Sequence, residues 1–119
     1  MVANNNITGN TGRGIVRHGG TTSSYTADYN NVYNNGTNYD QLSAGSHDTS
    51  VNPHYVGSGN PWEWYHIQAS SPIRNTGSNT WAPVYDLDGD WRLSGGTVSM
   101  GADEISGPVN RLFLPVILK

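Results

Sequence analysis

The sequence predicts an all-β chain, because its composition disfavours helix and its apolar residues occur in short runs between turns. The chain has 119 residues, of which 15 Gly, 14 Asn, 12 Ser and 10 Thr account for 51. These residue types weaken helix interiors. No window of useful length carries apolar residues at i, i+3, i+4 and i+7 without an interrupting Gly, Pro or Asn. Short strands with dense turns leave a sandwich, a barrel or a solenoid.

The expected elements are short runs of β-type residues. In chain order they cover residues 14–16, 32–33, 55–56, 64–67, 84–85, 98–100 and 112–114. Turn residues separate them, such as Gly19-Gly20, Asn35-Gly36 and Gly95-Gly96. We therefore expect strands of two to four residues joined by turns and longer loops.

An internal repeat favours the solenoid among these architectures. Residues 5–10 (NNITGN) match residues 30–35 (NNVYNN) at an offset of 25, and each copy places one aliphatic residue, Ile7 or Val32, after two asparagines. In a parallel solenoid these aliphatic residues would stack, and stacked Asn amides would form ladders. Asparagine also tolerates the left-handed backbone angles of a coil corner. Two imperfect copies in an Asn-rich chain are also consistent with coincidence.

Five further pieces occur in order along the chain: residues 28–35 (DYNNVYNN), 47–56 (HDTSVNPHYV), 64–73 (WYHIQASSPI), 86–92 (DLDGDWR) and 100–104 (MGADE). With these pieces the segment from Ala27 to Glu104 resembles the end of a right-handed parallel β-helix protein. The similar family is that of bacterial pectate-lyase-like surface proteins with a choice-of-anchor type terminal region. The resemblance implies a right-handed parallel β-helix (solenoid) fragment with a C-terminal cap and long loops. The chain departs from the family at Asn52, where an aspartate is usual, and at residues 74–77.

The resemblance also divides the chain and places it in the cell. It implies β-helix coils over residues 1–46, a terminal coil and capping region over 47–108, and an apolar C-terminal strand or tail over 109–119. It implies further coils before Met1, so an open coil face would favour self-association. The expected location is extracellular or at the cell surface, although this chain carries no secretion signal.

Charge and composition exclude several classes of partner. The chain has a net charge of −3, one Lys and five scattered Arg, whereas a nucleic-acid groove needs clustered cations. No apolar run reaches the roughly 18 residues of a membrane helix, so no membrane span is expected. Cysteine is absent, which removes thiolate metal sites and a cysteine nucleophile. The four histidines lack a zinc-type spacing, so no zinc site is predicted.

Three aspartates in one loop are the candidate metal ligands. Asp86, Asp88 and Asp90 alternate around Gly89, and carboxylates at i, i+2 and i+4 can converge on calcium. The alternative is a structural turn in which the Asp side chains accept backbone N–H bonds and Arg92 pairs with one carboxylate. The resemblance favours the turn, and no other cofactor is expected.

Tryptophans supply the candidate ligand-binding surface. On a strand over residues 62–67, alternation places Trp62, Trp64 and His66 on one face. The resemblance implies that Tyr65 and Ile67 point inward, which leaves the two indoles outward. Exposed rings suit stacking on sugar faces, because both surfaces are flat and apolar. The alternative is that the tryptophans pack beneath long loops.

The sequence therefore predicts a noncatalytic structural or binding module, the C-terminal end of an extracellular β-helix protein that contacts polysaccharide or another cell-surface polymer. The alternative is a fragment of a pectate-lyase-like polysaccharide lyase or glycosidase. No catalytic residue is assigned. Arg17 and His18 beside Asp28 suggest only a base–carboxylate pair on a coil face.

Overall fold

The computed structural model describes residues 1–19 and 24–105. Within them the strands are β1 (Val2–Ala3), β2 (Asn6–Thr8), β3 (Arg13–Val16), β4 (Ala27–Asp28), β5 (Asn31–Tyr33) and β6 (Thr37–Asp40). Three 3-10 segments follow, η1 (Pro61–Tyr65), η2 (Asn79–Trp81) and η3 (Arg92–Gly95), and the described residues contain no α-helix. The predicted strand 112–114 and tail 109–119 lie outside the described residues, as does the end of the predicted capping region.

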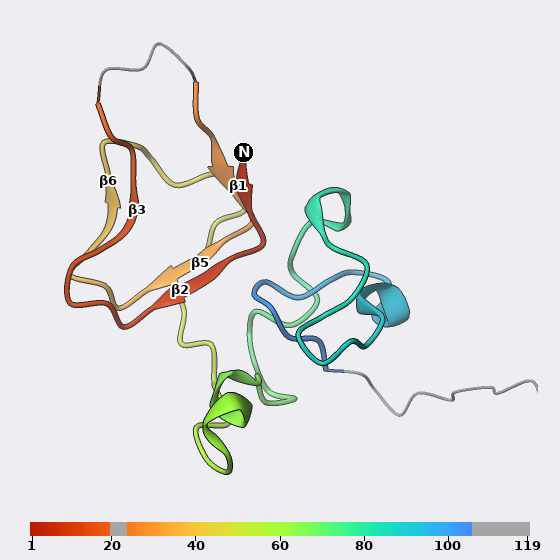
Figure 1. Ribbon diagram of the computed structural model, residues 1–119. Helices are drawn as coiled ribbons and strands as arrows, with labels where there is room; N and C mark the ends of the chain where they lie inside the picture. The colour runs from red at the N-terminus through yellow and green to blue at the C-terminus, as the bar shows by residue number, and fades with distance from the viewer. Residues whose placement is uncertain (20–23, 106–119) are drawn as a thin grey trace, which may run out of the picture.

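The six strands form three parallel pairs in which the second pass of the chain lies against the first. β1 pairs with β4, β2 with β5, and β3 with β6. Partners in the first two pairs are 25 residues apart, as in Asn6 with Asn31, and partners in the third pair are 24 apart, as in Ile15 with Tyr39. The two passes trace the same three-sided outline (Figure 1). The predicted pairing of the two copies of the repeat is confirmed.

Asparagine ladders join the two passes at their corners. Asn5 Nδ2 donates to Asn30 Oδ1 at 2.9 Å, and Asn10 Nδ2 donates to Asn35 Oδ1 at the same distance. Asn30 in turn donates from its backbone and side chain to Asp48 Oδ1, at 2.7 and 3.0 Å, so Asp48 adds a third rung. These bonds satisfy amides that cannot enter the strand ladders because the chain turns there.

The corners also repeat in their backbone conformation. Asn4 and Tyr29 have φ values of 59° and 60°, and Gly9 and Asn34 have values of 71° and 53°. Each pair is separated by 25 residues, and all four lie in the left-handed region that Gly and Asn adopt at least cost. The tight corners are therefore encoded in both copies of the repeat, with Tyr29 as the one bulky exception among these four.

One aliphatic or aromatic residue from each strand fills the space inside the two passes. Ile15, Ala27 and Val32 are buried there, and Val2, Ile7, Tyr39 and Leu42 pack against them. Strand register stacks Val2 on Ala27, Ile7 on Val32 and Ile15 on Tyr39. Gly14 lies so close to this core that an added Cβ would come within 2.7 Å of Val32 Cγ1. A side chain at Gly14 would displace the packing.

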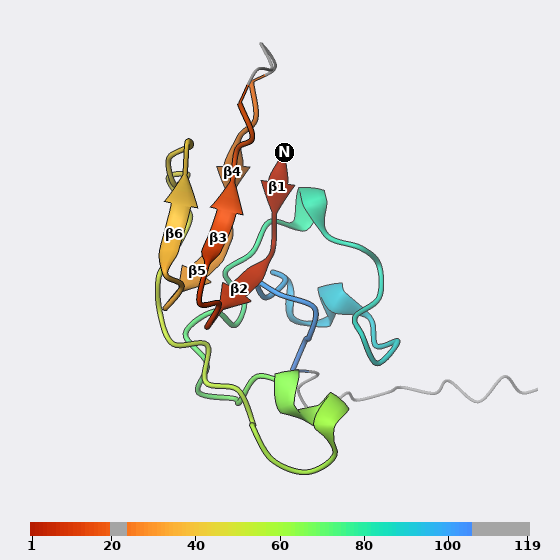
Figure 2. The same ribbon diagram turned by 60° about the vertical axis from the view of Figure 1, so that its left-hand side comes forward.

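The region after residue 46 is mostly irregular and lies beside β1 and β2 (Figures 1 and 2). It has its own small core of Ile67, Ile73 and Met100. Asn4 fastens this region to the strands, because its side chain donates to Ser78 O at 2.8 Å and accepts from Ser78 N at 2.7 Å. The backbone N–H of Gly101 also donates to Asn4 O at 2.8 Å.

The prediction of a strand over residues 64–67 is wrong. Trp64 and Tyr65 belong to η1, and Ile67 alone makes an isolated antiparallel bridge, with Tyr55. Pro61 accounts for the difference, because its fixed φ and missing N–H suit the first position of a helical turn. The expected strand over 98–100 does not form either, and within 84–85 Tyr85 makes only a bridge to Trp91.

Short strands in small parallel sheets, without α-helix in the described ranges, fit the predicted all-β class. No helix within residues 1–19 and 24–105 has the length and apolar character needed to cross a bilayer.

Candidate functional site

The segment η1 presents two exposed tryptophans on a fixed turn. Trp62 and Trp64 are 58% and 47% exposed. The turn is held at its start, where the Asn60 backbone N–H donates to Glu63 Oε2 at 2.9 Å. Its other end is closed by the His66 N–H, which donates to Glu63 O at 3.1 Å. Both indoles therefore project from backbone that hydrogen bonds define.

The two indoles do not share a face as the strand pattern predicted. A 3-10 segment turns by about 120° per residue, so side chains two positions apart diverge. Tyr65 is 65% exposed and not inward as predicted, and its ring meets that of Tyr55 edge to face with centroids 5.9 Å apart. Trp64 points elsewhere, and its Nε1–H donates to Gly59 O at 3.2 Å. The prediction that Ile67 is buried is confirmed.

A surface groove runs along one side of this turn. Its walls combine one aromatic ring with charged and small residues: Val56, Ser58, Gly59, Trp62, Glu63, His66 and Asp88. The rings of Trp62 and His66 meet edge to face with centroids 5.8 Å apart. The groove thus contains two of the three predicted ligand-binding residues, Trp62 and His66, while Trp64 is not among its lining residues.

His66 forms the centre of a cluster with two carboxylates. Its Nδ1 lies 3.1 Å from Asp103 Oδ1 and 3.5 Å from Asp88 Oδ2. The ligand atoms of the three residues all lie within 4.8 Å of one another. Asp103 is buried, His66 is half-buried and Asp88 is at the surface. The cluster therefore connects the groove to the interior of the C-terminal region.

The buried carboxylate of Asp103 is only partly satisfied. Its Oδ2 accepts the backbone N–H of Ile67 at 2.9 Å, whereas its Oδ1 has no hydrogen-bond partner among the described residues. Burial raises the pKa of Asp103, and the negative charges of Asp86 and Asp88 add to the rise. The Ile67 N–H and His66 oppose it. An ionised Asp103 is therefore in an environment that favours a nearby positive charge.

The three aspartates of the predicted calcium site do not act as one group. Asp86 Oδ1 accepts the backbone N–H groups of Asp88 and Asp90 at 2.9 and 2.8 Å, and its Oδ2 accepts the Glu104 N–H at 3.2 Å. Asp86 is thus the acceptor of a structural turn. Asp88 instead faces His66, and Gly89 completes the turn with φ at 84°.

The predicted pairing of Arg92 with one of these aspartates is wrong. Arg92 is buried, and its Nε donates to Glu104 Oε1 at 3.1 Å. Its Nη2 also donates to the carbonyls of Ser99 and Gly101, at 2.9 and 2.7 Å. Glu104 accepts the Ser99 N–H at 2.6 Å, so the ion pair is enclosed by hydrogen bonds. This arrangement is typical of a structural pair, because each charge is met by several partners.

The carboxylate of Asp28 pairs with a different histidine from the one expected. His47 Nδ1 lies 2.9 Å from Asp28 Oδ2, and the His47 backbone N–H donates to Asp28 Oδ1 at 2.7 Å. The side-chain bond to His47 lowers the pKa of Asp28. The His47 ring stacks on Tyr29 with centroids 4.3 Å apart. His18 is exposed.

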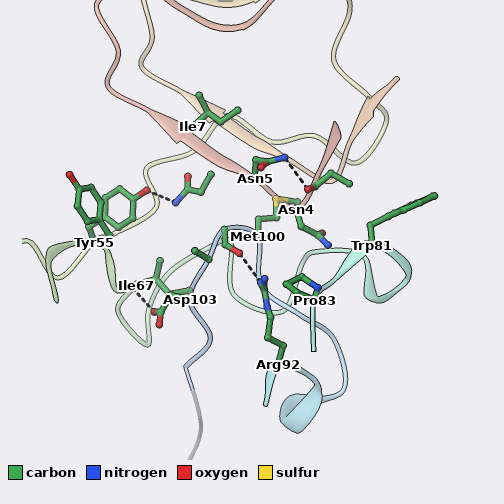
Figure 3. Close-up of a pocket in the computed structure, with 15 residues that line it drawn as sticks. Asn4, Asn5, Ile7, Tyr55, Ile67, Trp81, Pro83, Arg92, Met100 and Asp103 are labelled. Carbon is green, nitrogen blue, oxygen red and sulfur yellow. Dashed lines mark hydrogen bonds between the residues drawn. The ribbon is translucent and has the colours of Figure 1, made fainter. Parts of the chain in front are cut away.

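A second cavity lies where the strands meet the C-terminal region (Figure 3). Asn6 Nδ2 donates to Tyr55 Oη across it at 2.8 Å. Arg92, Met100 and Asp103 also line this cavity (Figure 3). The cavity is a seam between the two parts of the molecule, held together by polar bonds.

No family model, curated protein or solved structure matches this chain.

Sequence reasoning found His66 and Asp88 but assigned them to different sites, and it missed Asp103. The three positions are far apart in the chain, so no local spacing joins them. The only signal was that Asp103 belongs to the segment MGADE, which the family resemblance had singled out as a closing piece.

Proposed function

We propose that this chain is a noncatalytic binding module, the terminal coils and cap of an extracellular right-handed parallel β-helix protein, and that it contacts polysaccharide through the groove beside Trp62. The 25-residue register of the first two strand pairs supports the solenoid, because each pass lays its aliphatic residue on the one before. The Asn5–Asn30 and Asn10–Asn35 bonds support it further, since coil corners are where such ladders form.

The observation that carries the binding role is the exposure of Trp62 in a groove that also holds polar groups. An exposed indole in a groove is suited to contact with a partner, because covering it removes apolar surface from water. An indole face packs against the C–H face of a sugar ring, and Glu63 and Asp88 can accept hydrogen bonds from sugar hydroxyls beside it.

The test is binding of a neutral β-glucan and of polygalacturonate in native affinity gels, with intrinsic fluorescence as a second readout. We expect Trp62→Ala to weaken binding about tenfold or more, since an aromatic contact is worth on the order of 1–1.5 kcal/mol beyond its area. Trp64→Ala is the matched control, because its ring is also exposed but does not line the groove. Its effect should stay below about threefold.

Equal binding by wild type and Trp62→Ala would refute the stacking role. Cleavage of polygalacturonate by the chain, seen as new ultraviolet absorbance from an unsaturated product, would refute the noncatalytic assignment. Trp62→Ala is expected to fold, because the side chain is mostly exposed.

A further inference from the structure

We propose that His66, Asp88 and Asp103 bind a divalent transition metal ion of the zinc class, with a fourth coordination position open toward the groove beside Trp62. This inference is independent of the polysaccharide proposal, because it concerns the metal alone.

Two of the three distances between ligand atoms in the cluster fit such an ion. Zinc–ligand bonds of about 2.0–2.1 Å in a tetrahedron place neighbouring ligand atoms about 3.3 Å apart. His66 Nδ1 lies 3.1 Å from Asp103 Oδ1 and 3.5 Å from Asp88 Oδ2, which brackets that value. The Asp88 side chain is 33% exposed and can adjust its carboxylate, whereas Asp103 is fixed by the Ile67 N–H.

The buried oxygen of Asp103 is a second observation in favour of a cation at this cluster. Asp103 Oδ1 points into the cluster, is shielded from solvent and has no hydrogen-bond partner within the described ranges. Its 3.1 Å approach to His66 Nδ1 therefore does not have the geometry of a hydrogen bond. A buried carboxylate oxygen without a hydrogen bond is costly. A metal ion placed between the imidazole and the two carboxylates would satisfy it.

The ligand types select the metal. One imidazole nitrogen with two carboxylates suits zinc and its first-row neighbours, whereas calcium requires six or more oxygen ligands. Three protein ligands leave one tetrahedral position for water or for an oxygen of a bound molecule. His66 and Asp88 both line the groove, so that position faces the same space as the Trp62 ring.

Charge supports the same assignment. Asp86 and Asp88 both place negative charge near Asp103, and Asp86 already uses both oxygens on backbone N–H groups. A divalent cation at the cluster would offset the remaining carboxylates. The buried Arg92 does not do so, because it is engaged by Glu104 and two backbone carbonyls.

The experiment uses the full chain, stripped with chelator, and titrates it with Zn²⁺ in a calorimeter. Co²⁺ serves as a spectroscopic probe, because a tetrahedral site gives strong visible d–d absorption. We expect one ion per chain. Asp88→Asn and Asp103→Asn should each weaken binding on the order of 100-fold, since the loss of a direct ligand costs at least as much as the loss of a supporting residue.

Asp90→Asn is the matched control, because it removes a carboxylate from the same loop but outside the cluster. Its affinity for Zn²⁺ should stay within about threefold of wild type. Absence of saturable Zn²⁺ and Co²⁺ binding would overturn the inference. An equal loss in Asp90→Asn, or tighter binding of Ca²⁺ than of Zn²⁺, would overturn it in favour of the oxygen-only set. Because Asp88 is partly exposed, its variant keeps the test decisive even if Asp103→Asn does not fold.

Discussion

Replacement of Asn30 by alanine should destabilise the paired strands more than any other single change in the asparagine ladders. The Asn30 side chain is completely buried between the two passes. Its Oδ1 accepts the backbone N–H and the side-chain Nδ2 of Asn5, at 3.1 and 2.9 Å. Its Nδ2 donates to Val2 O at 2.9 Å and to Asp48 Oδ1 at 3.0 Å. The Asn30 amide therefore connects Val2 of β1, Asn5 at the corner that follows β1, and Asp48.

The magnitude follows from the groups that the substitution leaves without partners. A typical hydrogen bond contributes about 1 kcal/mol net, and a buried group left unsatisfied costs about 1–3 kcal/mol. Asn30→Ala removes a partner from Val2 O, from the Asn5 N–H and from the Asp48 carboxylate. Asp48 keeps the Asn30 backbone N–H, which limits its share. The expected loss is about 3–5 kcal/mol, a large part of the stability of a domain of this size.

Equilibrium unfolding in urea, followed by far-ultraviolet circular dichroism, measures this loss. Asn10→Ala is the matched control, because Asn10 makes the same amide bond to Asn35 at an exposed corner. Water replaces the lost partner there, so the control should cost less than about 1 kcal/mol. Equal losses of unfolding free energy in the two variants would refute the argument that burial makes the Asn30 bonds more stabilising than the exposed Asn10–Asn35 bond.

Two further predictions concern charged pairs. Arg92→Ala should destabilise the C-terminal region by about 3–5 kcal/mol, because it leaves the Glu104 carboxylate buried without its opposite charge. Arg13→Ala is the control, because it breaks an exposed pair with Asp40, and it should cost less than about 1 kcal/mol in the same urea titration. Asp28→Asn should make the free energy of unfolding depend less on pH in the acidic range. The folded pKa of Asp28 lies below the ordinary 3.8, so the bond to His47 stabilises the fold above that pH and is lost as the pH falls through the folded value. Urea midpoints between about pH 3 and pH 7 measure this, and parallel profiles for variant and wild type would contradict it.

Local patterns in the sequence predicted the pairing of β2 with β5, whereas β1, β4 and β6 were not among the expected runs. The offset between the two copies of the repeat reappears as the register of Asn6 with Asn31 and of Ile7 with Val32. Each pass repeats the same short order of corner, asparagine and aliphatic residue, so the information lies in neighbouring positions. The corners follow for the same reason, since Gly9 and Asn34 can adopt a left-handed backbone with little strain.

The 3-10 segment η1 is where the strand predicted from the local sequence pattern did not form. The alternation of apolar and polar residues over 62–67 predicted a strand, but Pro61 and the bond between Asn60 and Glu63 start a 3-10 turn instead. The consequence is functional, because Trp62 lines the groove with His66, whereas Trp64 is not among the lining residues. Whether such a segment forms a strand or a turn depends on local hydrogen bonds, which the alternation of apolar and polar residues does not reveal.

By itself the sequence determined the all-β class and the pairing distance of the first two strand pairs, because composition and short repeats act through neighbouring residues. Only the tertiary structure decided that Arg92 meets Glu104, that Asp28 meets His47, and that His66 collects Asp88 and Asp103 into one cluster. These groupings depend on the paths of long loops. A charged side chain pairs with the opposite charge or unsatisfied polar group that the folded loops bring near it. Spacing along the chain does not determine that partner.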